Sequence, residues 1–116
     1  MSYWVYLEDA QRESMGVKSH EEGSTYTISG TDRAELNVTY NYSGYYREHL
    51  DSELGLRWLH GRTASETIER LEAAVAALGT ERSPDHWEGS PGNAGHALSV
   101  LLGWARQHPD GVWFVS

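Results

Sequence analysis

The sequence predicts an α+β domain, a mainly antiparallel sheet with two principal helices packed on one face. Apolar and polar residues alternate in the first third of the chain, as in strands that are buried on one side. In the second half, apolar residues recur every three or four positions, as in helices. The 116 residues contain no visible linker or repeat, so we expect a single domain over residues 1–116.

Four segments favour strands. Three lie in the first third, at Tyr3–Leu7, Ser24–Ser29 and Leu36–Ser43, and are rich in β-branched and aromatic residues. Glycine-containing turns over residues 16–23 and 29–32 should connect them. The fourth, Val112–Val115, should pair with the N-terminal sheet. The clearest alternation has an apolar face formed by Leu36, Val38, Tyr40 and Tyr42 and a polar face formed by Asn37, Thr39, Asn41 and Ser43.

Helix signals dominate the second half, after a short helix expected over residues 45–50. Thr63 and Glu66 have the spacing of a capping box at a helix start, and Gly79 is a typical helix stop. The apolar stripe between them consists of Ile68, Leu71, Val75 and Leu78. A second helix is predicted from about Pro91 to Gln107, with Ser90 or Asn93 as N-cap. Its inward residues are Ala94, Ala97, Leu98, Leu101, Leu102 and Ala105.

Composition excludes several classes of function. The chain has 9 Lys and Arg residues against 17 Asp and Glu residues, a formal net charge of −8, so we expect no direct binding to nucleic acid. It has no cysteine, which excludes disulfides and thiolate metal sites. Neither a membrane-spanning segment nor a secretory signal is apparent, so we expect a cytoplasmic protein without membrane contact.

The polar row Asn37, Thr39, Asn41 and Ser43 is the first candidate site. Asparagine amides both donate and accept hydrogen bonds, and a rigid strand could present four such groups to a small polar ligand. The alternative is an ordinary solvent-facing strand surface.

The segment 90–96 is the second candidate site. Exposed N–H groups at a glycine-containing helix start could bind an anion near Asn93, with His96 as a proton donor. The alternative is a capped helix start whose glycines permit close packing.

Three residues are candidates for a protein interface. Arg57 and Trp58 lie in a short segment between glycines, and arginine and tryptophan are favoured in interfaces. Trp87 lies in an expected loop, where a large apolar side chain needs a core pocket or a partner. For Arg57 and Trp58 the alternative is a connector that lines the core.

Catalytic motifs are absent from the sequence. It contains no phosphate-binding loop, no GxSxG nucleophile motif and no HExxH spacing among its six histidines. We therefore assign no catalytic residue, metal ligand or cofactor, and a non-enzymatic role is favoured.

Three segments carry a resemblance to known proteins: Tyr3–Asp9, Leu36–Ser43 and Pro91–Leu98. On these segments the chain resembles a group of small uncharacterised proteins of bacteria and phages. The resemblance implies a bacterial or phage origin, and it implies no activity or site residue.

The leading functional hypothesis is a small acidic protein-binding domain, such as a phage-encoded inhibitor or modulator of a host defence system. An immunity protein or antitoxin that neutralises a toxin is a close alternative. A small-ligand binder or minor enzyme that uses Asn37, Asn41 and the Asn93–His96 segment is the alternative from another class. The sequence leaves the oligomeric state open.

Overall fold

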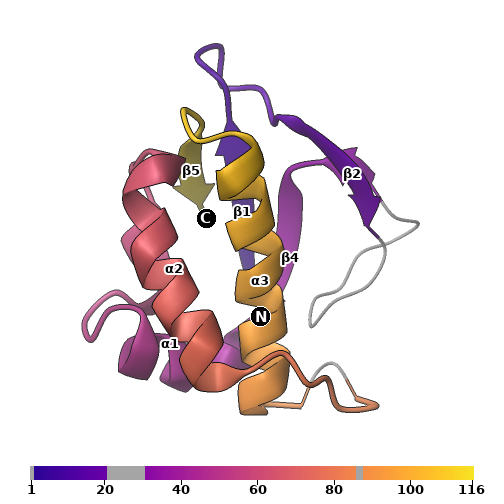
Figure 1. Cartoon of the computed structure of the whole chain (residues 1–116), viewed down its shortest axis with the longest axis vertical. Helices are drawn as coiled ribbons and strands as arrows, with labels where there is room; N and C mark the ends of the chain where they lie inside the picture. Colours follow the sequence, from indigo (N-terminus) through magenta and orange to yellow (C-terminus); the bar gives the residue numbers. More distant parts are fainter. Residues whose placement is uncertain (1, 21–30, 86–87) are drawn as a thin grey trace.

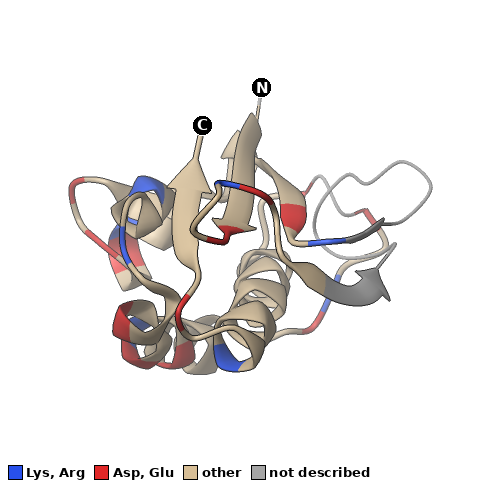
Figure 2. Ribbon diagram, turned by 90° about the horizontal axis from the view of Figure 1, so that it is seen from above, with Lys and Arg blue, Asp and Glu red and all other residues tan. Residues whose placement is uncertain are grey.

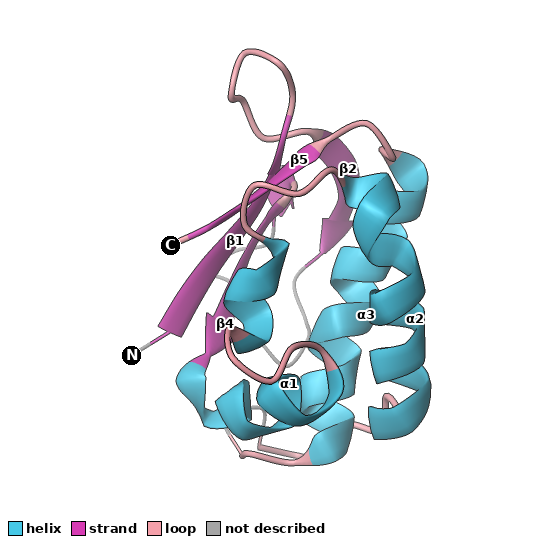
Figure 3. Cartoon of the chain, turned by 90° about the vertical axis from the view of Figure 1, so that its left-hand side faces the viewer, coloured by secondary structure: helices cyan, strands magenta, loops and turns pink. Residues whose placement is uncertain are grey.

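The computed structural model describes residues 2–20, 31–85 and 88–116, and it confirms the α+β class. A three-stranded antiparallel sheet has the order β4 (Glu35–Thr39), β1 (Ser2–Glu8), β5 (Val112–Val115). The helices α2 (Ala64–Leu78) and α3 (Pro91–Gln107) pack against each other on one side of this sheet (Figures 1 and 3). The predicted pairing of the last strand with the N-terminal strand is therefore confirmed.

The central strand β1 separates the two faces of the sheet. Tyr3, Val5 and Leu7 are buried beneath the helices, together with Trp113 and Val115 of β5. Because side chains alternate along a strand, Trp4 and Tyr6 point to the opposite face. The core is thus shared by both halves of the chain.

The predicted strand Leu36–Ser43 is wrong beyond Thr39. Strand β4 ends there, and the chain continues as a 3-10 helix η1 (Tyr40–Tyr42) and the short helix α1 (Ser43–His49). The Thr39 hydroxyl accepts the N–H of Asn41 at 3.2 Å, which ends the strand by capping the next turn. Helical geometry also buries Tyr42 and Tyr46 one turn apart, with their rings edge to face.

A second, two-stranded sheet was not predicted. Strands β2 (Gly16–His20) and β3 (Thr31–Arg33) form it, where the sequence favoured turns at residues 16–23 and 29–32. These segments lack a regular apolar alternation, so their extended form is set by antiparallel pairing rather than by their own pattern. The predicted strand Ser24–Ser29 lies outside the described residues.

Both long helices begin and end as predicted. The Thr63–Glu66 capping box is formed, with the Thr63 N–H donating to the Glu66 carboxylate at 3.2 Å. Gly79 ends α2 with a φ of 76°, a conformation that favours glycine. Ser90 caps α3 by accepting the N–H of Asn93 at 3.2 Å. Among the described residues, none of the helices has the length and hydrophobicity of a membrane-spanning segment.

The buried stripe of α2 differs from the prediction by one position at two points. Ile68 and Val75 lie at the margin of the core, whereas Thr67 and Ala74 are buried. Thr67 can occupy the core because its hydroxyl both donates and accepts a hydrogen bond. It donates to the carbonyl oxygen of Ala64 at 2.7 Å and accepts the indole N–H of Trp113 at 2.9 Å. A buried hydroxyl with both bonds made costs little.

Replacing Thr67 by valine is expected to lower the free energy of unfolding by about 1–3 kcal/mol, because the buried Trp113 N–H loses its acceptor. Thr67→Ser keeps the hydroxyl and loses one methyl group, so it should cost about 1 kcal/mol. Urea unfolding of the two variants measures the difference. A valine variant as stable as the serine variant would show that the hydrogen bond contributes nothing.

The buried hydroxyl of Tyr46 leads us to expect that the protein loses stability at alkaline pH. This hydroxyl donates to the carbonyl oxygen of Ala94 at 3.0 Å. Desolvation first, and then Tyr42 and Tyr3, raise the pKa of Tyr46 well above 10.0. The pKa of Tyr46 is higher in the folded than in the unfolded protein. The protonated hydroxyl therefore makes its full contribution to the free energy of unfolding below about pH 10, and this contribution is lost as the pH rises above that value.

Tyr46→Phe should therefore cost about 1 kcal/mol at neutral pH, and its stability should converge with that of the wild type above about pH 10. Urea unfolding across this pH range provides the measurement. The control is Tyr45→Phe, which removes an exposed hydroxyl bonded to Gly89 and should leave the alkaline loss unchanged. A pH-independent difference between Tyr46→Phe and the wild type contradicts the prediction.

Candidate functional site

The outer face of the sheet, opposite the helices, is unusually apolar. Trp4 is 42% exposed on β1, and Val112 and Phe114 are each 39% exposed on β5. The register places Tyr6 directly opposite Phe114. An antiparallel sheet with one buried face ordinarily presents polar residues on the other, so these side chains call for a functional explanation.

The aromatic side chains of this face form a continuous row. The Trp4 and Tyr6 rings are stacked with centroids 6.2 Å apart. Tyr6 contacts Phe114 at 5.9 Å, and Phe114 contacts His60 at 5.0 Å. We call Trp4, Tyr6, Phe114 and His60 the aromatic face. Because each ring packs against its neighbour on a rigid sheet, a partner would order few further rotamers on binding.

His60 is held in this row by the last strand. It follows the 3-10 helix η2 (Gly55–Leu59), and its Nδ1 accepts the backbone N–H of Val115 at 3.1 Å. The residues after it pair with the same strand, since Gly61 donates to Trp113 and Trp113 donates to Arg62. The neutral His60 ring therefore carries its hydrogen on Nε2. This side of β5 is already paired, so a partner has access to the face rather than to the edge.

The polar groups of the aromatic face differ from those of the buried aromatic residues. The buried Trp113 N–H and Tyr46 hydroxyl both have internal acceptors. In the part of the chain that the structure describes, the Trp4 indole N–H and the Tyr6 hydroxyl have no hydrogen-bond partner. Amphipathic rings with unused polar atoms are typical of binding surfaces.

Two negatively charged side chains, Glu8 and Glu35, lie beside the aromatic face. Glu8 follows Tyr6 on the same face of β1, and Glu35 of β4 lies opposite Tyr6 in the register. Figure 2 shows acidic segments at the end of β1 and at the start of β4. Desolvation, then Glu35 and Glu8, raise the pKa of Tyr6 above 10.0. The Tyr6 hydroxyl is therefore protonated at neutral pH and sits in a negative potential.

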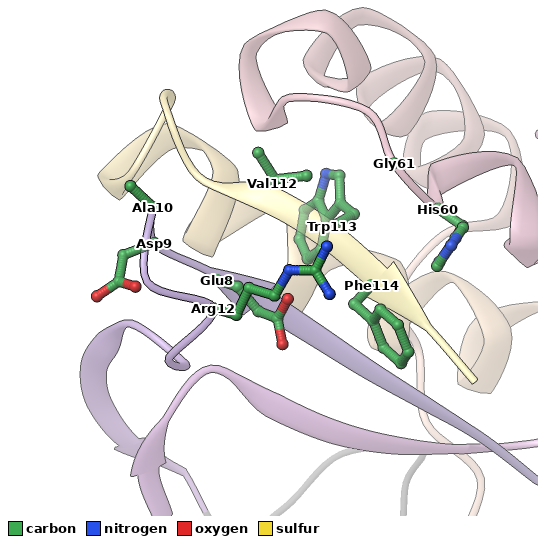
Figure 4. A pocket seen from close by; sticks show the side chains of 9 residues that line it. All are labelled: Glu8, Asp9, Ala10, Arg12, His60, Gly61, Val112, Trp113 and Phe114. Carbon is green, nitrogen blue, oxygen red and sulfur yellow. The ribbon is translucent and has the colours of Figure 1, made fainter.

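A hollow of about 400 Å³ adjoins the aromatic face between the loop after β1 and strand β5 (Figure 4). Asp9 shapes the loop by accepting the N–H groups of Gln11 and Glu13. Arg12 has a φ of 62°, and its side chain reaches into the hollow. The hollow is lined by Glu8, Asp9, Ala10, Arg12, His60, Gly61, Val112, Trp113 and Phe114.

The predicted polar row does not form a single surface. Asn37 is buried and donates to the Ser2 hydroxyl at 2.7 Å and to the Tyr3 carbonyl oxygen at 3.2 Å. Thr39 caps the 3-10 helix that contains Asn41, and Ser43 bonds to the hydroxyl of Tyr3. Binding of a ligand here stays a prediction. The Asn37 amide and the Thr39 hydroxyl already form hydrogen bonds within the protein that stabilise the fold.

At the start of α3 the side chain of Asn93 forms its hydrogen bonds within the protein, and anion binding there stays a prediction. Asn93 is 0% exposed, and its amide accepts the Ser83 N–H and donates to Ser83, Asp85 and Glu88. A side chain on Gly92 would overlap the Glu81 carbonyl oxygen. His96, half-buried, lies one turn further along α3. This geometry favours the alternative, a capped helix start with close-packed glycines.

Arg57 and Trp58, two of the three predicted interface residues, pack against residues outside the aromatic face. Trp58 is buried, with the guanidinium groups of Arg62 and Arg70 over its ring at 4.5 and 4.4 Å. The Arg57 guanidinium lies 5.0 Å from the centre of the Tyr3 ring. Trp58 thus fits the connector alternative, whereas Arg57 is exposed and its role in an interface stays a prediction. Trp87 lies outside the described residues.

The sequence carries a signal for the aromatic face in the first strand. Trp4 and Tyr6 alternate with Val5 and Leu7, so one of the two faces of β1 had to be aromatic. The pattern did not say which face was buried. Among the described residues there is no cluster of three or more His, Asp or Glu side chains that could hold a metal ion.

Comparisons with protein families, with curated proteins and with solved structures find no match for this chain. The resemblance to small bacterial and phage proteins therefore stays a prediction. The assignment of function depends on the geometry of the aromatic face.

Proposed function

We propose that this protein is a binding domain that engages a different protein through its aromatic face. The observation that carries the proposal is the row of contacting rings from Trp4 to His60 on the exposed side of the sheet. Tryptophan and tyrosine dominate binding energy in protein interfaces because they bury a large area with few rotatable bonds.

The charge of the chain favours a basic partner. With a formal net charge of −8, the protein attracts a basic surface and repels a second copy of itself. Glu8 and Glu35 place part of that charge beside the rings. An inhibitor, a modulator or an antitoxin can act by covering a basic surface of another protein, so the proposal includes these roles.

Site-specific photocrosslinking tests the proposal. Phe114 is replaced by p-benzoylphenylalanine, and Ala76, exposed on α2, receives the same replacement as a control. We expect the Phe114 probe to crosslink to one protein of the source cell and the Ala76 probe not to do so. The captured protein is then purified, and its affinity for the wild type is measured by calorimetry.

Trp4→Ala is expected to weaken that affinity by about 30-fold, as for a central interface tryptophan, and the far-ultraviolet circular dichroism should be unchanged. Ala76→Ser, on the control surface, should have no effect. Equal crosslinking from both positions, or full affinity of the Trp4→Ala variant, contradicts the proposal. Crosslinking of the chain to a second copy of itself would also overturn it.

A further inference from the structure

Tyr6 has four neighbouring side chains on the outer face of the sheet, two along its own strand and two on the adjacent strands. Along β1 its neighbours on this face are Trp4 and Glu8, and across the sheet they are Glu35 and Phe114. Two neighbours are therefore aromatic rings and two are carboxylates. An aromatic ring and a carboxylate each attract a cation, and together they define a position for one.

The structure supplies little compensating charge at this position. The Glu8 carboxylate has no hydrogen-bond or ion-pair partner in the described ranges of the chain, and Glu35 accepts one bond, from the Ser14 hydroxyl at 2.9 Å. Arg12 is the cation that lines the adjoining hollow (Figure 4). Its guanidinium forms no ion pair with Glu8 in the described structure, so neither carboxylate is paired with a cation among the described residues.

We infer that an arginine or lysine side chain from a basic segment of the partner protein lies against Tyr6 and Phe114, between Glu8 and Glu35. This inference rests on the proposed function and names the chemistry that the aromatic face recognises. A guanidinium group suits the position best, because its plane stacks on a ring while its edge donates to carboxylates. Desolvation first, and then the negative charges of Glu35 and Glu8, raise the pKa of Tyr6, and the carboxylate part of this shift is consistent with the inference.

The same pairing occurs within this chain. The guanidinium groups of Arg57, Arg62 and Arg70 lie over the rings of Tyr3 or Trp58 at 4.4–5.0 Å. Arg70 also donates to the Asp51 carboxylate at 3.3 Å, which combines a ring and a carboxylate around one guanidinium. The partner side chain would reproduce this arrangement between two proteins. Because these three arginines already lie over rings of their own chain, they are poor donors to a second copy.

The test is a titration of the full-length protein with two short peptides. The probe is acetyl-Gly-Arg-Arg-Gly-amide, and the matched control replaces both arginines by citrulline, which keeps the shape and removes the charge. Binding is followed by two-dimensional NMR at low salt, through the indole N–H of Trp4 and the backbone N–H signals of Tyr6, Glu8 and Phe114. We expect these four signals to shift with the arginine peptide and to stay in place with the citrulline peptide.

Three variants locate the charge that is recognised. Glu8→Gln should weaken binding of the arginine peptide by about threefold, the effect of an exposed ion pair. Arg12→Ala should strengthen it, because the loss of this nearby positive charge lowers the electrostatic repulsion of the peptide. Glu69→Gln removes the same charge from the exposed surface of α2 and should have no effect. Equal shifts with both peptides, or equal effects of Glu8→Gln and Glu69→Gln, would overturn the inference.

The outcome is separable from that of the proposed function. If the Phe114 probe captures a partner but the arginine peptide does not bind, the protein-binding role stands and the cation position is wrong. If the arginine peptide binds and no partner depends on Trp4, the cation position stands and the protein-binding role is wrong. Sedimentation velocity of the protein alone adds one further result: self-association that Trp4→Ala abolishes would identify a second copy as the occupant and overturn the inference.

Discussion

Replacing Gly95 by alanine is expected to lower the free energy of unfolding by about 3 kcal/mol or more, because the new methyl group has no room between the two long helices. It would overlap the carbonyl oxygen of Gly79 and lie 3.0 Å from Cβ of Leu78. The atom that it meets belongs to the backbone, so the end of α2 must move. For a chain of this size the midpoint of thermal unfolding should fall by about 10 °C or more.

Gly103 provides the matched control on the same helix. It is exposed, and a methyl group added there meets nothing within 4 Å. Gly103→Ala should therefore raise the free energy of unfolding by about 0.5–1 kcal/mol through the better helix propensity of alanine. Differential scanning calorimetry of both variants measures the contrast. Similar effects of the two substitutions would mean that α2 and α3 are not packed as described.

Asn93→Asp should be the second strongly destabilising substitution, at about 3 kcal/mol or more at neutral pH. The change is almost isosteric, so it acts through hydrogen bonding and charge. The Asn93 amide donates to the carbonyl oxygens of Asp85 and Glu88 at 3.1 and 3.0 Å. A carboxylate would place a buried negative charge against these same oxygens. A charge near the start of a helix gains about 0.3–1 kcal/mol from the helix dipole, which is too little to offset this loss.

The control for Asn93→Asp is Gln11→Glu, the same exchange of an amide for an acid in an exposed loop. It should change the free energy of unfolding by less than about 0.5 kcal/mol. Guanidinium unfolding at neutral pH compares the variants. If Asn93→Asp were as mild as the control, the hydrogen bonds of the amide to Ser83, Asp85 and Glu88 would not stabilise the start of α3.

Elements with strong local signals were predictable from the sequence. The capping box at Thr63 and the glycine at position 79 determine the ends of α2 through local hydrogen bonds and backbone conformation. The strand predicted over Leu36–Ser43 failed because the same apolar spacing that fits a strand up to Val38 also fits the helical burial of Tyr42 and Tyr46. Whether the chain continues as a strand or turns into a helix depends on the hydrogen bond of the Thr39 hydroxyl. Only the three-dimensional structure shows that this hydroxyl accepts the N–H of Asn41.

The candidate site was less predictable than the fold. Asparagine side chains looked available in the sequence, but Asn37 and Asn93 are bonded to residues 34 and 10 positions away. Conversely, Trp4 and Tyr6 lie in a strand that reads as core, and their exposure follows from the side on which α2 and α3 pack. Site residues that depend on distant contacts cannot be assigned from local patterns.

The pairing of the last strand also has a consequence for solubility. Its sequence, Val-Trp-Phe-Val, is short, uncharged and strongly β-forming, which is the composition of segments that nucleate aggregation. On one side it is covered by β1, and on the other the Trp113 backbone groups bond to residues 61 and 62. The His60 ring occupies the next N–H, that of Val115, where an incoming strand would attach. His60 is thus part of the proposed binding surface and, together with Gly61 and Arg62, covers the edge at which a further strand would pair.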